Sequence, residues 1–161
     1  MDDLLASCSD LPRRSVPAGE ILIAQGQPLR SIYLLETGSV EIERDGARLA
    51  LLDTPGSVLG EMSTLLKSDA TATTRAVTDA TFLVADDAES FLTSRPDVLF
   101  AVASALARRL DNLTGHLVDV KRQYGGDDGH LGMLDDVLST LMHHQSRRVT
   151  PGSARMPELD Y

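Results

Sequence analysis

The first part of the chain, residues 15–85, alternates short apolar runs with breaks that contain glycine or proline. The runs are rich in Ile, Leu and Val, and "VEIE" (40–43) alternates apolar with acidic residues, as a strand with one solvated face does. Asp45-Gly46 is a strong hairpin turn. We expect strands at 20–24, 31–36, 40–43, 48–53 and two more within 73–85. Short strands with regular breaks predict a small jelly-roll β-barrel.

From residue 86 onward the apolar residues follow a helical period. "DDAESFLTS" (86–94) predicts a short helix with acids in its first turn, and Pro96 stands where the next helix begins. That helix carries a heptad stripe of Leu99, Ala103, Leu106, Leu110, Leu113, Leu117 and Val120. The stripe packs either on its own barrel or on a second copy, and its length favours a dimer.

A second, shorter helix follows a glycine-containing loop. Gly125-Gly126 ends the heptad helix, and residues 131–144 place Leu131, Leu134, Leu138 and Leu141 on one face. The last residues have no periodicity and predict a flexible tail. The expected organisation is therefore a barrel with an N-terminal helical segment (1–96), a long helix (97–124), a loop with a C-terminal helix (125–146) and the tail (147–161).

Composition narrows the classes of function. The chain has 161 residues, 42% of them hydrophobic, with a net charge of -9 and a pI near 4.7. Such an acidic chain disfavours nucleic acid as a partner, because phosphate contacts need clustered Lys and Arg. No apolar run is long enough to cross a bilayer, and acids precede the first apolar residues, unlike a secretory signal. A single cysteine, Cys8, excludes an intrachain disulfide. We expect a cytoplasmic protein that binds neither DNA nor membrane.

Catalytic and metal-binding patterns are missing from the sequence. It has no Ser-His-Asp order, no paired catalytic carboxylates and no Walker-type glycine loop. His143 and His144 are adjacent and therefore point to different sides of a helix, and His116 lies off the heptad seam. We expect neither an enzyme nor a metal site nor a bound cofactor.

Two stretches carry a family resemblance. The first is "VPAGEILIAQGQPLRSIYLLETGSVEI" (16–42), with glycines at 19, 26 and 38, and the second is Gly60-Glu61-Met62 followed by Leu65-Leu66. Over about residues 4–124 the chain resembles the cyclic nucleotide-binding domain family, the sensor module of bacterial catabolite activators, protein kinase A regulatory subunits and gated channels. The resemblance implies a jelly-roll barrel followed by a dimerisation helix, with a phosphate-binding cassette that begins at Gly60.

The cassette implies six ligand-binding residues: Gly60, Glu61, Met62, Ser63, Ala70 and Thr71. In the family, the glutamate accepts a hydrogen bond from the ribose 2′-hydroxyl, which here assigns that role to Glu61. Gly60 permits close approach of the backbone, and residues 63–65 form a short helix whose amides face the phosphate. Thr71 is either a contact to the purine edge or an ordinary strand threonine.

One residue departs from the family pattern. The family's Arg-Thr-Ala-Thr aligns with "ATAT" (70–73), so Ala70 replaces the phosphate-binding arginine, and Asp69 replaces the usual proline. A charge-assisted contact is worth roughly 1.5–3 kcal/mol, so its loss weakens binding by about one to two decades. Arg75 and Lys67 are the candidate substitutes. Strand alternation places Arg75 on the opposite side from Ala70.

The resemblance predicts a sensor or regulatory protein, a homodimer that binds cyclic AMP, cyclic GMP or a related anion weakly and relays binding through its C-terminal helices. The alternative is a degenerate domain that binds no nucleotide and serves as a dimeric scaffold. A transcription factor without its DNA domain ranks lower, because Asp127, Asp128, Asp135 and Asp136 surround the last helix and leave no basic recognition face. That helix is a candidate docking element for a protein partner.

Overall fold

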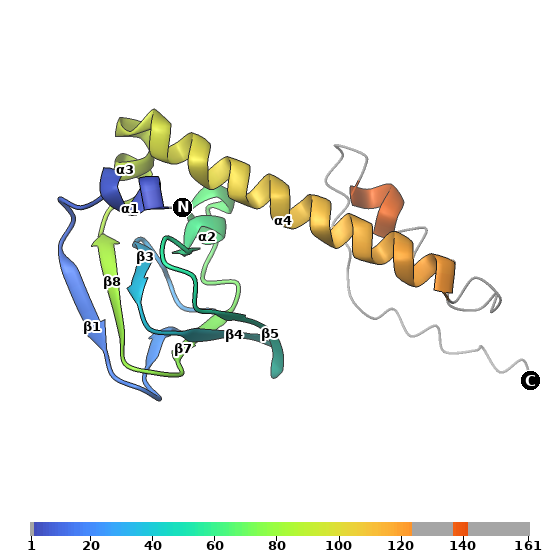
Figure 1. The fold of residues 1–161 in the computed structure, drawn as a ribbon, viewed down its shortest axis with the longest axis horizontal. Coiled ribbons are helices and arrows are strands. Elements are labelled where there is room, and N and C mark those ends of the chain that lie inside the picture. The colour runs from blue at the N-terminus through green and yellow to red at the C-terminus, as the bar shows by residue number, and fades with distance from the viewer. Residues whose placement is uncertain (1, 124–136, 142–161) are drawn as a thin grey trace, which may run out of the picture. The chain divides into compact units, whose positions relative to one another are not determined.

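The computed structural model describes residues 2–123 and 137–141, and it divides into two compact units, residues 1–106 and 107–161. Most of the described secondary structure belongs to the first unit (Figure 1). The elements in chain order are α1 (Asp2–Ser7), β1 (Arg13–Val16), β2 (Ile21–Ile23), β3 (Ile32–Thr37), β4 (Val40–Arg44), β5 (Ala47–Leu52), β6 (Val58–Leu59), α2 (Glu61–Leu66), β7 (Thr73–Ala76), β8 (Ala80–Ala85), α3 (Ala88–Ser94) and α4 (Pro96–Gln123).

The strands form two antiparallel sheets. Sheet A has the order β1-β8-β3-β6, and sheet B has the order β2-β7-β4-β5. This arrangement confirms the jelly-roll architecture, and all six expected strands are present. Two observed strands, β1 and β6, were not predicted. β1 exposes three of its four residues and so has no apolar run, and β6 has only two residues.

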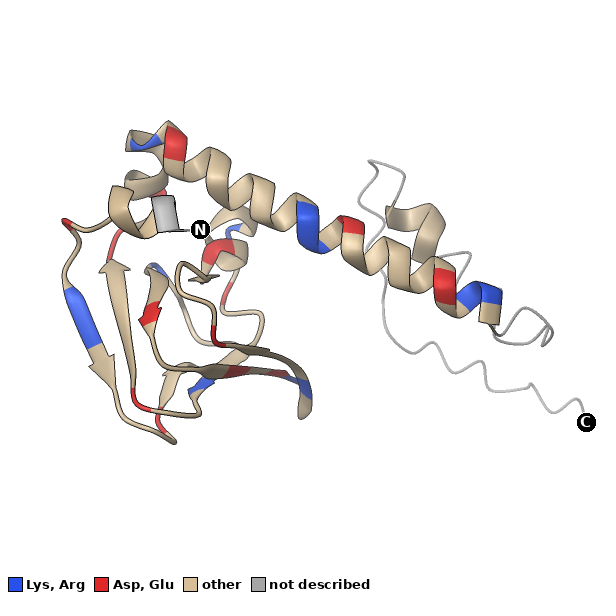
Figure 2. Ribbon diagram, viewed as in Figure 1, with Lys and Arg blue, Asp and Glu red and all other residues tan. Residues whose placement is uncertain are grey.

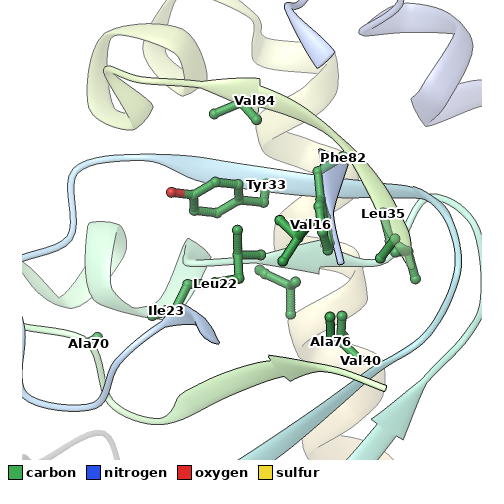
Figure 3. Close-up of a cluster of buried hydrophobic side chains, with 12 residues drawn as sticks. Val16, Leu22, Ile23, Tyr33, Leu35, Val40, Ala70, Ala76, Phe82 and Val84 are labelled. Carbon is green, nitrogen blue, oxygen red and sulfur yellow. The ribbon is translucent and has the colours of Figure 1, made fainter. Parts of the chain in front are cut away.

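Sheet A separates two hydrophobic clusters. Side chains of β3 and β8 alternate between them: Tyr33, Leu35, Phe82 and Val84 lie in the barrel cluster, and Ile32, Leu34, Leu83 and Ala85 lie in the helix-side cluster. The barrel cluster lies between the two sheets (Figure 3). The helix-side cluster lies against α3 and the first turns of α4 and includes Cys8, Phe91, Val98 and Val102. Both strands are therefore apolar on both faces, which explains their continuous hydrophobic runs.

The helices after the barrel begin as their sequences predict. Asp87 caps α3 by accepting a hydrogen bond from the Ser90 amide at 3.0 Å, and Pro96 is the first residue of α4.

The heptad stripe describes only part of α4. The buried residues of this helix are Val98 and Val102, which lie outside the stripe, because the first turns of α4 cover their own unit instead of a partner. Leu99 and Leu106 also pack on the helix-side cluster, whereas Leu110, Leu113 and Val120 are exposed. The stripe is therefore divided between an intramolecular beginning and an exposed continuation.

Of the helix expected at 131–144, residues 137–141 are described and are helical. The rest of that helix, the loop before it and the tail 147–161 lie outside the described residues. None of the described helices combines the length and the apolar character needed to span a bilayer.

Candidate ligand-binding site

The turn between β6 and α2 is formed by a glycine that no other residue can replace without strain. Gly60 has φ 90°, in the left-handed region, and precedes the first residue of α2. A Cβ at this position would lie 2.7 Å from the Ser31 carbonyl oxygen and 3.2 Å from a methyl carbon of Leu29. The β6–α2 backbone is thus packed against the loop that leads into β3, and this close approach fixes where α2 begins.

Two polar side chains in the first turn of α2 are buried. Glu61 is 5% exposed and Ser63 is 4% exposed, whereas Met62 between them is 42% exposed. In the described part of the chain, the buried polar or charged residues are Ser57, Glu61, Ser63 and Thr74, so half of them lie in this turn. Burial of a carboxylate is costly without compensating interactions, and Glu61 has an interaction partner in the structure.

The C-terminal end of α2 is also closely held. Lys67 adopts φ 51° and its amide donates to the carbonyl oxygens of Ser63 and Thr64, while the Ser68 amide donates to Ser63 at 3.0 Å. These bonds end the helix after six residues. The short helix is thus defined at both ends by left-handed residues, one of which the sequence analysis identified through its glycine.

Ala70 is fixed in position by its backbone. Its amide donates to the Gln27 carbonyl oxygen at 2.9 Å, and its own carbonyl oxygen accepts from the Gly26 amide at 2.8 Å. Its side chain is 4% exposed and belongs to the barrel cluster. Figure 3 shows Ala70 beyond Ile23 at the periphery of that cluster. The backbone around residue 70 is therefore ordered although the arginine is missing.

The two candidate substitutes for the arginine are engaged elsewhere. The Arg75 guanidinium donates to the Gly19 carbonyl oxygen at 2.9 Å, and its neighbours Thr74 and Ala76 are the buried residues of β7. The Lys67 ammonium lies 3.3 Å from the Glu89 carboxylate on α3. Thr71, the remaining candidate, is half-buried.

The inner face of the β4–β5 hairpin is only partly covered. Ile42, Ala50 and Leu52 are half-buried, and Ile42 and Leu52 pack on the barrel cluster. By contrast, Leu35 and Phe82 on sheet A have no exposed surface. The barrel interior is thus densely packed at sheet A and less covered at the hairpin, where an apolar surface remains accessible.

A groove of about 970 Å³ lies between α2, the loop before β3 and the start of α3. Its lining includes the acidic residues Asp69, Asp86, Asp87 and Glu89 and the basic residues Arg30 and Lys67. Of the six predicted ligand-binding residues, Ser63 lines this groove, whereas Gly60, Glu61, Met62, Ala70 and Thr71 do not. Figure 2 shows further basic positions on β1, on the β4–β5 hairpin and on β7, apart from Arg30 and Lys67 of the groove.

Sequence reasoning missed the groups that hold the site in place. The carbonyl oxygens of Ser31 and Gln27, which contact the Gly60 turn and Ala70, are backbone atoms and carry no residue-specific signal. Only the glycine at position 26, with φ 78°, indicated that its loop is sharply turned. Among the described residues, no group of His, Cys, Asp and Glu side chains is arranged to hold a metal ion.

The chain is similar in sequence to a known domain family and to bacterial cyclic AMP receptor proteins. Residues 13–92 match the family model for the cyclic nucleotide-binding domain. The chain is 34% identical over 105 residues to the cyclic AMP receptor protein of Thermus thermophilus, covering 61% of this chain and 48% of that protein. It is 28% identical over 110 residues to a cAMP-activated global transcriptional regulator of Mycobacterium tuberculosis, covering 65% and 49%.

Solved structures agree with the fold. The crystal structure of the Thermus thermophilus catabolite activator protein matches with a TM-score of 0.59 and 26% identity, covering 88% of this chain and 81% of that chain. The chain spans between about a quarter and half of the length of the curated relatives that it matches.

Proposed function

Because residues 13–92 belong to the cyclic nucleotide-binding domain family, we propose that this chain is a ligand-sensing regulatory module whose ligand binds at the Gly60–Thr71 cassette. The observation that carries the proposal is the Gly60 turn, whose left-handed glycine is packed against Ser31 and is followed by a buried glutamate. A buried carboxylate can accept a hydrogen bond from a ribose hydroxyl. The activity is binding and regulation, not catalysis.

The ligand class is cyclic AMP, cyclic GMP or a related small anion, bound weakly. Glu61 accepts from the ribose, and the amides at the start of α2 face the phosphate. Weak affinity follows from Ala70, because no guanidinium is available at that position to form a charge-assisted bond. The expected loss is about one to two decades relative to a site that has the arginine.

Relay of binding runs from α2 to α3. The Lys67–Glu89 pair joins the end of the cassette helix to α3 at 3.3 Å, and the Ala88 amide at the start of α3 donates to the Arg30 carbonyl oxygen at 2.8 Å. A ligand that shifts α2 therefore acts on α3, and through the Arg95–Pro96 junction on α4.

A homodimer is part of the proposal. Leu113 is 50% exposed and Leu110 is 45% exposed on α4, and these stripe positions need a partner surface. Light scattering after gel filtration measures the mass directly. We expect a dimer at micromolar concentration and a monomer for Leu113→Asp, because a charge in the seam has no partner. A monomeric wild-type protein would contradict the proposed homodimer.

Calorimetric titration with cyclic AMP and cyclic GMP tests the ligand. Wild-type binding no tighter than micromolar is expected, and nanomolar binding contradicts the role given to position 70. Ala70→Arg, alone and with Asp69→Pro, is expected to strengthen binding by roughly a decade or more. Ala70→Met is the matched control, since it adds similar length without charge, and Glu61→Ala in the double variant removes most of the gain.

The second candidate is a domain that binds no nucleotide and serves as a dimeric scaffold. The observation in its favour is that Ala70 is part of the apolar barrel cluster. This candidate is preferred if the folded Asp69→Pro, Ala70→Arg variant gives no heat with either nucleotide. A protein partner for the helix at 131–144, and a cytoplasmic location, remain predictions from the sequence.

A further inference from the structure

The groove between α2, the loop before β3 and the start of α3 has walls that are fixed by backbone hydrogen bonds. The Ser68 amide donates to the Ser63 carbonyl oxygen at 3.0 Å, and the Ala88 amide donates to the Arg30 carbonyl oxygen at 2.8 Å. The first bond closes the end of α2, and the second joins the loop to α3. The volume of about 970 Å³ is at the upper end of the range for small-molecule sites, about 300–1,000 Å³. The groove therefore has the size of a ligand site, and its walls are in place without a ligand.

A buried hydroxyl without a partner lines this groove. Ser63 is 4% exposed, and its hydroxyl makes no hydrogen bond within the described part of the chain. The hydroxyls of Thr64 and Ser68, which also line the groove, donate to the carbonyl oxygens of Gly60 and Asp69 at 3.1 and 3.2 Å. Among the described residues, no side-chain polar atom is fully enclosed without a partner, so the Ser63 oxygen retains access to the groove that it lines. Because buried polar groups normally have a hydrogen-bond partner, Ser63 is a point where a ligand would supply one.

Six charged side chains line the groove, and three of them are already engaged. Lys67 pairs with Glu89 at 3.3 Å, and Asp87 accepts a hydrogen bond from an amide of α3 at 3.0 Å. The other three are exposed and form no ion pair or side-chain hydrogen bond with the described residues: Arg30, Asp69 and Asp86. The groups left for a ligand are therefore one guanidinium, two carboxylates and the Ser63 hydroxyl.

These groups select the chemistry of the ligand. A guanidinium binds a carboxylate through two parallel hydrogen bonds, and a carboxylate accepts hydrogen bonds from an ammonium or a guanidinium. A simple anion would leave Asp69 and Asp86 unpaired, and a polyamine would place positive charge beside Arg30. A ligand with one carboxylate and two cationic groups complements all three side chains. Free arginine and free lysine have this set of groups, namely an α-carboxylate, an α-ammonium and a side-chain cation.

We propose that this groove is a second ligand site and that it binds a free basic amino acid, arginine or lysine. Arg30 binds the α-carboxylate, Asp69 and Asp86 bind the two cationic groups, and the Ser63 hydroxyl completes the site with a hydrogen bond. The inference goes beyond the proposed function, because it concerns a different ligand and does not require a cyclic nucleotide to bind. An amino acid in the groove joins the end of α2 to the start of α3, as the Lys67–Glu89 pair does.

The test is an NMR titration of the ¹⁵N-labelled full chain that follows the amide signals of residues 63–69 and 86–89. L-Arginine is compared with agmatine, which lacks the α-carboxylate, and with L-citrulline, which lacks the side-chain charge. L-Lysine is compared with cadaverine and L-norleucine in the same way. We expect at least one of the two amino acids to bind roughly fivefold more tightly than both of its analogues, the effect of one exposed ion pair. Added NaCl should weaken this binding, because the charged groups are exposed.

Two variants assign the contacts. Arg30→Met should weaken binding of the amino acid to the level of the analogue without a carboxylate, and it should not weaken binding of that analogue. Asp86→Asn should weaken binding of both compounds. Arg14→Met and Glu20→Gln are the charge-matched controls, since both residues are exposed and lie outside the groove, and neither should change the affinities.

Two results would overturn the inference. The first is the absence of shifts at the groove amides with both amino acids. The second is binding of agmatine and cadaverine to the wild-type protein as tightly as arginine and lysine, since Arg30 would then contact no carboxylate. Both results leave the proposed function intact, because that function is tested separately by titration with cyclic nucleotides.

Discussion

The two hydrophobic clusters on either side of sheet A share strands but differ in how they are closed. The helix-side cluster is enclosed by α1, α3 and the start of α4, and its members Cys8 and Ile32 have no exposed surface. The barrel cluster is equally dense at Leu35 and Phe82 but is less covered at Ile42 and Leu52. The helix-side cluster is thus covered on all sides, whereas the barrel cluster leaves apolar surface exposed on the β4–β5 hairpin.

Arg95 accounts for much of the closure on the helix side. Its guanidinium donates to the Ser7 carbonyl oxygen at 2.7 Å, pairs with the Asp10 carboxylate and lies over the Phe91 ring, 5.2 Å from its centroid. One side chain at the α3–α4 junction therefore holds the segment after α1. Ala70 of the barrel cluster is held instead by backbone hydrogen bonds with Gln27 and Gly26.

The largest expected effect comes from the shared strands. Phe82→Ala removes a fully buried ring from the barrel cluster, and Leu34→Ala removes a buried side chain from the helix-side cluster. We expect losses of about 3–5 and about 2–5 kcal/mol in the free energy of unfolding. Urea denaturation followed by tyrosine fluorescence and by circular dichroism measures both. Leu49→Ala, at a 59% exposed position, is the control and should change stability by less than about 0.5 kcal/mol.

Because β3 and β8 contribute to both clusters, each core variant should give coincident transitions with the two probes. Separate transitions in Leu34→Ala would show that the helix-side cluster unfolds independently of the barrel cluster. The two clusters would then not be coupled through β3 and β8.

The next prediction compares two glycines of the barrel. Gly38 has φ 89°, and a Cβ there would lie 2.4 Å from the Asp79 carbonyl oxygen and 2.7 Å from the Ala80 Cα. Gly38→Ala combines left-handed strain with a backbone clash and should cost about 2–5 kcal/mol. Gly26 has φ 78° with open space around it, so Gly26→Ala should cost only about 1–2 kcal/mol. If Gly38→Ala and Gly26→Ala lose the same free energy of unfolding, the contact between Gly38 and the backbone of Asp79 and Ala80 does not account for the cost at Gly38.

Arg95→Met should open the helix-side cluster locally. Burial removes Cys8 from solvent and raises the pKa of its thiol, so the wild-type protein should react slowly with a thiol reagent. Without Arg95, the segment around Ser7 and Asp10 is released, and we expect the reaction rate to rise roughly fivefold or more through local opening. Arg13→Met, which removes the exposed Arg13–Glu36 pair at sheet A, is the matched control and should leave the rate unchanged. An unchanged rate in Arg95→Met would show that this arginine does not close the cluster.

The smallest effects are expected from pH. The hydrogen bond from Arg95 holds the pKa of Asp10 below its usual value, and the bond from Arg13 does the same for the pKa of Glu36. A carboxyl whose pKa is lowered in the folded state stabilises the protein above its unfolded pKa, about 3.9 for Asp and 4.3 for Glu. That contribution is lost as pH falls through the folded value.

Thermal melts between pH 7 and pH 3 should therefore decline less steeply in Asp10→Asn and Glu36→Gln than in wild type. Both pairs are substantially exposed, so the differences should be small. Melting curves with the same slope as wild type would show that these pairs contribute nothing measurable.

The sequence alone determined the architecture. Apolar runs, the Asp45-Gly46 turn and the change to a helical period gave the strands, α3 and α4, because these signals depend on local backbone preference and burial. The same signals failed at β1, where Arg13 and Arg14 occupy an exposed edge strand, and at β6, which has only two residues. They also did not predict that Val98 and Val102, which lie outside the heptad stripe, are the buried residues of α4. Helical periodicity does not show which neighbouring surface covers a given face of the helix.

The cassette was likewise predicted only in part. The Gly60-Glu61 pair and the replacement of the family's arginine by Ala70 followed from the resemblance to the cyclic nucleotide-binding domain family. The tertiary structure alone decided that Glu61 and Ser63 are buried, that Lys67 contacts Glu89, and that Arg75 contacts the Gly19 backbone. It also brought Arg95 to Ser7 and Asp10, which are more than eighty residues away in the chain. Such contacts depend on how distant segments pack and on which backbone carbonyls they present, and neither is encoded in local sequence patterns.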